Sequence, residues 1–236
     1  MPIAFDITGD IGMFRRPYTT TSSVSYPFPP PTAVGGMLGA LLGESLYDVD
    51  DAKGLDLLKG TSIAIRILSP VRWHREAINL TNVKRLGTHM IVQHQFVRDP
   101  SYRVYVSGGA EKDVKRALID KRGSYPLCMG VAYAMAEVVY KGELKKVGDT
   151  DRVHTVIPVF QNTDIDIDRE DNDIFTDIMP WRLDKDRTLR DTVTVLWSPG
   201  LKDKGLRILG SKNVDKGEYS AGKDLPTERI AWFQPW

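Results

Sequence analysis

Gly12–Gly43 reads GMFRRPYTTTSSVSYPFPPPTAVGGMLGALLG and joins a polar run to an apolar segment. Four prolines restrict the backbone between the two halves: Pro27, Pro29, Pro30 and Pro31. Thr32 is placed to cap a helix that begins at Ala33. A polar segment held between a strand and a buried helix presents hydrogen-bond donors on a fixed scaffold. Phosphates and sugars are natural ligands for such donors.

The polar half of this stretch is the first candidate binding site. Its members share a cationic or hydroxyl side chain: Arg15, Arg16, Tyr18, Thr19, Thr20, Thr21, Ser22 and Ser23. We interpret them as ligands of a nucleic-acid backbone, beside Phe14, Tyr18 and Tyr26, whose rings are suited to stacking on bases. The alternative is a solvated loop, which is the structure that Ser/Thr/Pro-rich segments usually form. Four prolines and the flanking aromatic residues favour binding, because a solvated loop rarely needs them to hold its shape.

The chain length, the net charge and the distribution of charged residues limit what kind of binding protein this can be. The 236 residues suffice for one large domain or two small ones, and the formal net charge is only +1. A nucleic-acid surface must therefore come from local segregation of charge, and residues 60–105 carry seven Arg/Lys against two acids. Residues 164–177 carry seven acids against one arginine. The single cysteine, Cys128, and the absence of a 20-residue apolar run predict a soluble cytoplasmic protein with no membrane contact.

Hydrophobic periodicity predicts an α+β fold. Strands are expected at residues 3–8, 61–68, 91–98, 102–107 and 136–141, and helices at 32–47 and 110–121. Residues 71–90 lack a clean period and suggest a loose hairpin. The order β-α-β-(excursion)-β-α-β matches the ferredoxin-like fold of RNA-recognition modules. We expect that domain over residues 1–141 and, over 142–236, a β-rich region packed on it.

The hairpin contains a second candidate site. Its members are basic or aromatic: Arg72, Trp73, His74, Arg75, Lys84, Arg85 and His89. A basic strip that includes a tryptophan suits single-stranded RNA, where stacking and phosphate contacts act together. The alternative is a basic surface hairpin whose Trp73 is tucked into the core.

The histidines leave an enzyme open as an alternative. Metal-independent RNA cleavage needs a base and an acid, and His74, His89 and His94 with Tyr18 and Lys84 offer suitable groups. No spacing makes this arrangement specific, so no catalytic residue is predicted.

Metal and cofactor signals are weak. Asp164, Asp166 and Asp168 begin like a calcium loop, but Arg169 stands where glycine is expected and Phe175 where the final acid is expected. There is no Cys/His cluster for zinc, no P-loop and no G-x-S-x-G elbow. We predict neither a metal nor a cofactor.

The N-terminal stretch resembles a known family. Phe14–Tyr18, Thr20–Ser22 and Tyr26–Gly39 are similar to the N-terminal signature of the Cas-five family. These proteins are the RAMP-type subunits of type I CRISPR effector (Cascade) complexes, and the type I-B branch is the most similar. The likeness extends over residues 1–141, a little over half of the chain.

The resemblance implies a ferredoxin-like domain with a thumb at about residues 71–90, and a role in RNA binding. Such a subunit grips the 5′ handle of CRISPR RNA and contacts the backbone subunit and the large PAM-reading subunit, with target DNA nearby. Handle binding would fall on Arg15, Arg16, Tyr18, Thr19, Thr20 and nearby hydroxyls, assisted by Lys84 and Arg85.

One branch of the family, type I-C, cuts precursor RNA with a tyrosine and an adjacent lysine and histidine. This chain has no Lys-His pair, which favours a non-catalytic role. Two alternatives stay open: a metal-independent endoribonuclease, and a protein–protein adaptor whose acidic residues 164–177 dock a basic partner.

Overall fold

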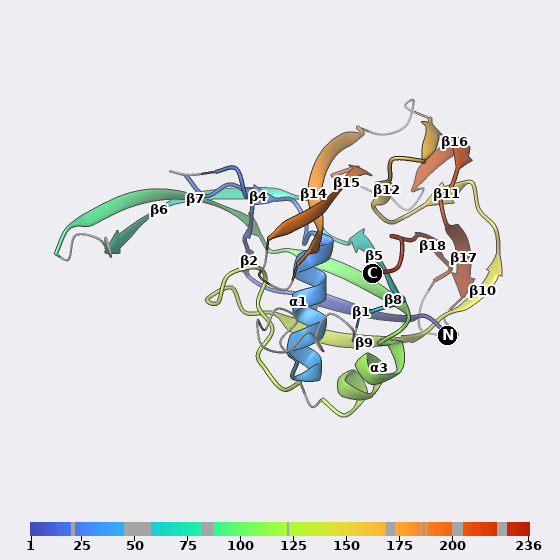
Figure 1. Ribbon diagram of the computed structural model, residues 1–236, viewed down its shortest axis with the longest axis horizontal. Coiled ribbons are helices and arrows are strands. Elements are labelled where there is room, and N and C mark those ends of the chain that lie inside the picture. The colour runs from blue at the N-terminus through green and yellow to red at the C-terminus, as the bar shows by residue number, and fades with distance from the viewer. Residues whose placement is uncertain are drawn as a thin grey trace.

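A computed structural model describes residues 1–19, 22–44, 58–81, 87–121, 123–168, 173–184, 186, 188–199, 205–220 and 226–236. These residues form a body made mostly of β-sheet with two helices, from which one long hairpin projects (Figure 1). No described helix is both long enough and apolar enough to cross a bilayer.

A four-stranded antiparallel sheet with the strand order β5-β8-β1-β9 lies at the centre. Its strands are β1 (Ile3–Thr8), β5 (Thr61–Ile67), β8 (Ser101–Gly108) and β9 (Glu137–Glu143). Ile3, Phe5 and Ile7 alternate along β1 and enter the main hydrophobic core together with residues of α1 (Pro31–Leu42). The predicted strands at all four positions are confirmed.

The two helices, α1 and α3 (Glu111–Ile119), begin and end differently from the prediction. Thr32 does not cap α1, because the N-cap residue is Pro30 and the helix starts at Pro31. α1 ends at Gly43, whose left-handed φ of 78° only glycine adopts readily. The predicted continuation to residue 47 falls on residues 45–57, which lie outside the described residues.

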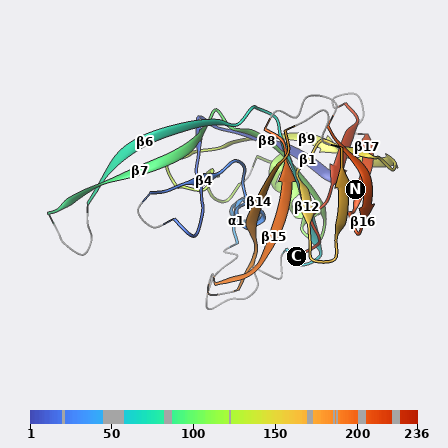
Figure 2. The ribbon, with the colours of Figure 1, turned by 90° about the horizontal axis from the view of Figure 1, so that it is seen from above.

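A long hairpin projects from the body (Figures 1 and 2). Its strands are β6 (Arg72–Thr81) and β7 (His89–Arg98), which pair over ten consecutive residues without a register shift. A hairpin was expected over residues 71–90, but it is regular rather than loose and extends to Arg98. β6 is exposed along nearly its whole length, so it has no buried face to impose the apolar alternation by which strands are recognised.

The polar N-terminal stretch folds as an arm beside the base of this hairpin (Figure 2). It contains the short strands β2 (Ile11–Gly12), β3 (Phe14–Arg15) and β4 (Ser25–Tyr26). β2 pairs with the inner end of β7, while β3 pairs with β4. We use "the arm" for the described residues between 11 and 26.

The chain beyond residue 142 is rich in β-strands, as predicted. These are β10 (Lys145–Gly148), β11 (Arg152–Val153), β12 (Ile157–Val159), β13 (Asp164–Ile167), β14 (Phe175–Leu183), β15 (Leu189–Trp197), β16 (Leu206–Lys212), β17 (Lys216–Ser220) and β18 (Glu228–Ala231). They form sheets of three strands, with orders β10-β17-β18, β11-β16-β13 and β12-β15-β14. β14 packs against α1, and Trp197 of β15 enters the main core.

The second face of the central sheet is closed by a buried ion cluster. The carboxylate of Glu228 on β18 is fully buried and lies 2.6 Å from a guanidinium nitrogen of both Arg66 and Arg103. Tyr105 donates a hydrogen bond to the same carboxylate at 2.8 Å, and Arg103 also pairs with Asp6 at 2.6 Å. Burial alone raises the pKa of Glu228, but the neighbouring His154 side chain and the charge of Arg66 outweigh burial and lower that pKa to about 2.

The substitution Glu228→Gln should destabilise the protein by about 3 kcal/mol at pH 7, because it removes the carboxylate that pairs with Arg66 and one of the two that pair with Arg103. The ordinary pKa of this carboxyl is 4.5, so its charge stabilises the fold above that pH. The stabilisation is lost as the pH falls from 4.5 towards 2. Urea unfolding should therefore separate the wild type from the variant widely at pH 7 and less as the pH falls below 4.

Glu218→Gln is the matched control. Glu218 pairs with Arg229 at 3.2 Å on the neighbouring strands β17 and β18, but both side chains are about one-third exposed. Its loss should cost at most about 1 kcal/mol. Equal losses for the two variants would contradict a special role for the buried cluster.

Candidate nucleic-acid interface

Arg16 fastens the arm to the body. Its guanidinium Nη1 lies 2.7 Å from Oδ1 of Asp177 on β14, and its Nε donates to the carbonyl oxygen of Ser25 at 3.3 Å. The guanidinium carbon also lies 4.6 Å from the ring centroid of Tyr26. Burial on its own lowers the pKa of Arg16, but the hydrogen bond and charge of Asp177 raise it above its ordinary value. The positive charge of Arg16 is thus paired with a carboxylate of the protein itself.

Two further hydrogen bonds support this junction. Tyr26 donates its hydroxyl to the carbonyl oxygen of Ile178 at 3.0 Å, next to the ion pair. Trp197 donates its indole N–H to Oδ2 of Asp177 at 3.1 Å, which orients the carboxylate toward Arg16. The arm and the β14–β15 hairpin therefore form one connected structure.

Arg15 and Tyr18 lie on the exposed side of the arm. Arg15 donates from Nη2 to the carbonyl oxygen of Thr19 at 2.8 Å, and its side chain faces solvent. Tyr18 is 67% exposed, with its hydroxyl 2.7 Å from Nη1 of Arg16. Thr19 donates its hydroxyl to the carbonyl oxygen of Arg16 at 2.8 Å, which tightens the turn between them. An exposed cation and an exposed ring thus occupy a braced loop.

Ser22 and Ser23 bring the arm onto the hairpin. Ser23 forms a parallel bridge with His94: its N–H donates to the carbonyl oxygen of Gln93 at 2.9 Å, and its carbonyl accepts from the N–H of Gln95 at 2.8 Å. This part of the arm is therefore joined to the edge of β7 by a single bridging residue.

An open polar pocket of about 210 Å³ lies at this junction. It is lined by Ser22, Ser23, Val24, Arg75, Gln93, His94 and Gln95. Ser22 and Ser23 come from the first candidate site and Arg75 from the second, so the fold brings residues of both into one place. Arg75 is the charged residue in this lining.

The hairpin divides the basic tetrapeptide at 72–75 between two faces. Side chains alternate along a strand, so Trp73 and Arg75 lie on the face that carries the pocket, and Arg72 and His74 lie on the other. Trp73 is 44% exposed, which excludes the alternative that it is tucked into the core. One face of the hairpin therefore combines an indole ring with a guanidinium group.

On the opposite face, Arg72 stands directly across from Arg98 of β7. Like charges in directly opposed positions repel, and both of these side chains are exposed. Arg98 lies 3.4 Å from the equally exposed Asp99, which screens it only weakly. This pair leaves net positive charge at the base of the hairpin.

The three histidines proposed for catalysis lie apart. His74 faces Glu76 at 3.7 Å, and His94 is buried, with Nδ1 3.1 Å from the carbonyl oxygen of Val92. His89 pairs with Thr81 at the outer end of the hairpin. Among the described residues they do not converge with Tyr18 on one site.

Four predicted ligands, Thr20, Thr21, Lys84 and Arg85, lie outside the described residues. Four other residues of this region were not predicted: Gln93, Gln95, Arg98 and Asp177. The two glutamines were detectable, because they alternate with the buried residues Val92, His94 and Phe96. Asp177 was not, since its partner Arg16 is remote in sequence.

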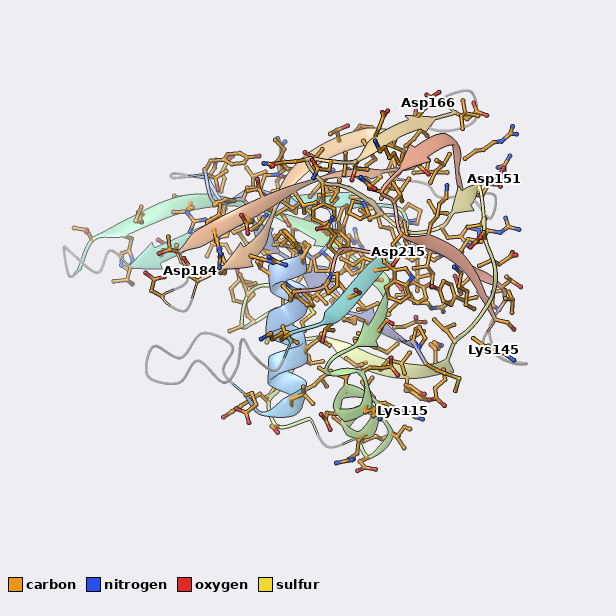
Figure 3. All side chains as sticks on the ribbon, turned by 45° about the vertical axis from the view of Figure 1, so that its right-hand side comes forward. Lys115, Lys145, Asp151, Asp166, Asp184 and Asp215 are labelled. Carbon is orange, nitrogen blue, oxygen red and sulfur yellow. The ribbon has the colours of Figure 1, made fainter. Side chains whose placement is uncertain are left out.

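The basic character of residues 60–105 is smaller than their composition suggests. Arg66 and Arg103 belong to the cluster around Glu228, where their side chains are only 15% and 10% exposed and their charges are paired with carboxylates. The acids Asp151 and Asp166 lie on the side of the body away from the hairpin (Figure 3).

In the part of the chain that the structure describes, no group of three His, Cys, Asp or Glu side chains is placed to hold a metal ion.

The same fold occurs in solved CRISPR structures. A crystal structure of a CRISPR protein from Archaeoglobus fulgidus aligns with a TM-score of 0.56 and 10% identity, over 99% of this chain and 100% of that chain. A chain of a CRISPR RNA-guided surveillance complex aligns with a TM-score of 0.51 and 9% identity, over 89% and 92% of the two chains. At such low identity the likeness establishes the fold.

Residues 3–149 match the model of the family described as CRISPR-associated protein (Cas_Cas5). The match spans more than half of the chain, so this protein belongs to the CRISPR-associated Cas5 family, as the N-terminal signature predicts. No curated protein sequence matches it significantly.

The Arg16–Asp177 pair should be measurable as a coupling energy. Arg16→Ala and Asp177→Asn should each lower the free energy of unfolding, and a double-mutant cycle should give a coupling of about 1–2 kcal/mol. Arg15→Ala is the control, because it removes only an exposed hydrogen bond and should change stability by less than about 0.5 kcal/mol. Urea denaturation of the four proteins measures these values; additive losses at Arg16 and Asp177 would disprove the coupling.

Proposed function

We propose that this protein is a non-catalytic RNA-binding subunit of a type I CRISPR effector complex, and that the arm and the adjacent hairpin bind the 5′ handle of CRISPR RNA. The pocket that joins Ser22 and Ser23 to Arg75 carries this proposal. Hydroxyl and guanidinium donors from two separate segments meet there in an open, polar setting. Such donors suit RNA, whose phosphates, 2′-hydroxyls and base edges all accept hydrogen bonds.

The two adjacent arginines have different roles in this proposal. Arg15 contacts a phosphate directly, because its guanidinium is exposed and has no acidic partner among the described residues. Arg16 is a positioning residue, because its charge is satisfied by Asp177 and it orients Tyr18. Tyr18 offers an exposed ring on which a base can stack.

The proposal assigns a role to each part of the chain. Residues 1–141, with the central sheet, α1 and α3, are the ferredoxin-like RAMP domain, and the β6–β7 hairpin is its thumb. Residues 142–236 are the β-rich region that covers the second face of the sheet. The partners are the CRISPR backbone subunit and the large PAM-reading subunit, and type I-B is the subtype that we propose.

A holding role is favoured over cleavage by the separation of the histidines. Metal-independent cleavage needs a base and an acid on either side of one phosphate. His94 is buried with its Nδ1 near a backbone carbonyl, and His89 lies at the outer end of the hairpin. The described side chains of the pocket offer ligands for RNA without a matched acid–base pair.

Arg15→Ala should weaken binding of a fluorescein-labelled RNA containing the repeat sequence by about tenfold, since a hydrogen bond to a charged group contributes about 1.5 kcal/mol. It should also reduce the slope of log K against log salt concentration by about 1, because one phosphate contact is lost. Fluorescence anisotropy over a salt series measures both quantities.

Lys145→Ala is the matched control for this experiment. Lys145 is exposed on β10, on the side of the body away from the hairpin (Figure 3). Its loss removes one positive charge from the protein without touching the proposed interface. If the two variants weaken binding equally, the arm has no special role and the RNA is held by overall charge.

The proposal also predicts that the purified protein leaves repeat-containing RNA intact. Incubation for hours in buffer with EDTA should give no discrete product on a denaturing gel, while the same RNA shifts on a native gel. A single cut at a defined position would instead establish the endoribonuclease alternative. RNA that neither shifts nor is cut would favour the adaptor alternative.

A further inference from the structure

We propose that the pocket face of the hairpin reads one unpaired RNA base, with the side-chain amides of Gln93 and Gln95 contacting its edge and Trp73 stacking on its ring. This inference rests on the proposed RNA-binding function and adds sequence selectivity to it.

The strand registers place the required side chains on one face. Gln95 stands directly across from Arg75, so their side chains share a face, and Gln93 lies two residues along the same strand. On the other side, Ser23 pairs with His94, which puts Ser22 beside the two glutamines. Four polar side chains thus border one pocket.

The mixture of donors and acceptors indicates a base rather than a phosphate. A phosphate oxygen only accepts hydrogen bonds, so a phosphate site needs donors alone. Each glutamine also carries a carbonyl acceptor, which calls for donors on the ligand. The edges of nucleobases present both ring or exocyclic N–H donors and acceptors, and side-chain amides are among the groups that read them. No acidic side chain lines the pocket, which disfavours a cationic ligand.

A stacking surface lies next to the pocket on the same face. Trp73 is two residues from Arg75 along β6 and directly across from Val97, which is buried and supports the ring from below. Its 44% exposure leaves room for a base to stack. The pocket volume of about 210 Å³ lies below the roughly 300–1,000 Å³ of drug-sized sites, which suits one base rather than several.

The pocket is also fixed before any ligand arrives. The Ser23 backbone donates to one strand residue and accepts from another, and the buried His94 ring stacks on Phe96 with a centroid distance of 5.9 Å. Preorganised groups discriminate between ligands well, because a mismatched base leaves a polar group unpaired.

The test uses the full chain and four labelled RNA octamers, rC8, rU8, rA8 and rI8. Within each pair, cytosine with uracil and adenine with hypoxanthine, the rings have equal size and stack similarly while their donor and acceptor edges are inverted. For the wild type, anisotropy should show at least about a fivefold difference in Kd within one pair or both. The variant Gln93→Ala/Gln95→Ala should reduce this difference to less than twofold and leave the salt slope unchanged, because amides carry no charge.

Three further variants complete the design. Trp73→Ala should weaken all four octamers, and Trp73→Phe should restore most of the loss. Asn79→Ala removes an exposed amide from the same face, four residues beyond Arg75 and outside the pocket, and should leave discrimination intact. Thermal melting of each variant checks that the hairpin still folds.

The outcomes separate the two proposals. A wild type that binds none of the octamers contradicts RNA binding itself. A wild type that binds all four without discrimination within either pair, or a double variant that discriminates as well as the wild type, overturns base reading and leaves RNA binding in place.

Discussion

The buried carboxylate of Glu228 is the interaction on which the layout of this molecule depends. It neutralises Arg66 and Arg103, two arginines that stand opposite each other on the central sheet and would otherwise repel. In doing so it holds β18 over the sheet face that RNA-recognition modules of similar topology leave open for RNA. The polar and cationic groups of the arm and hairpin remain exposed, which supports the RNA-binding role that we propose for them.

A second, partly buried ion pair, between Arg16 and Asp177, fixes the position of the arm. Loops that order only on binding lose affinity to the entropy of ordering. Here the ion pair, the Tyr26 hydroxyl and the Ser23 backbone bonds order the arm within the free protein. Arg15 and Tyr18 are therefore exposed on an ordered loop. The two adjacent arginines differ because Arg16 has an acidic neighbour, whereas Arg15 has none among the described residues.

Local patterns in the sequence were sufficient for the central sheet and for the family. Alternation along residues 3–8 and 61–67 identified buried strands, and the signature in residues 14–39 indicated the Cas5 family that the profile match confirms. The hairpin register was not predictable, because an exposed strand has no apolar face to reveal its period. The tetrapeptide at 72–75 therefore looked like one basic strip although its side chains point to two faces. The partner of Arg16 was hidden for another reason: ion pairs across the fold leave no local pattern.

The attachment of the arm to β14 also has a consequence during translation. Tyr26 and Ile178 are separated by 152 positions, and Asp177 is made only one residue earlier. At about 5–20 residues per second, a ribosome needs roughly 8–30 seconds to reach these partners after the arm has been synthesised. A nascent chain therefore displays Arg16 without its counter-charge, and the arm is fastened to the body only after β14 has been made.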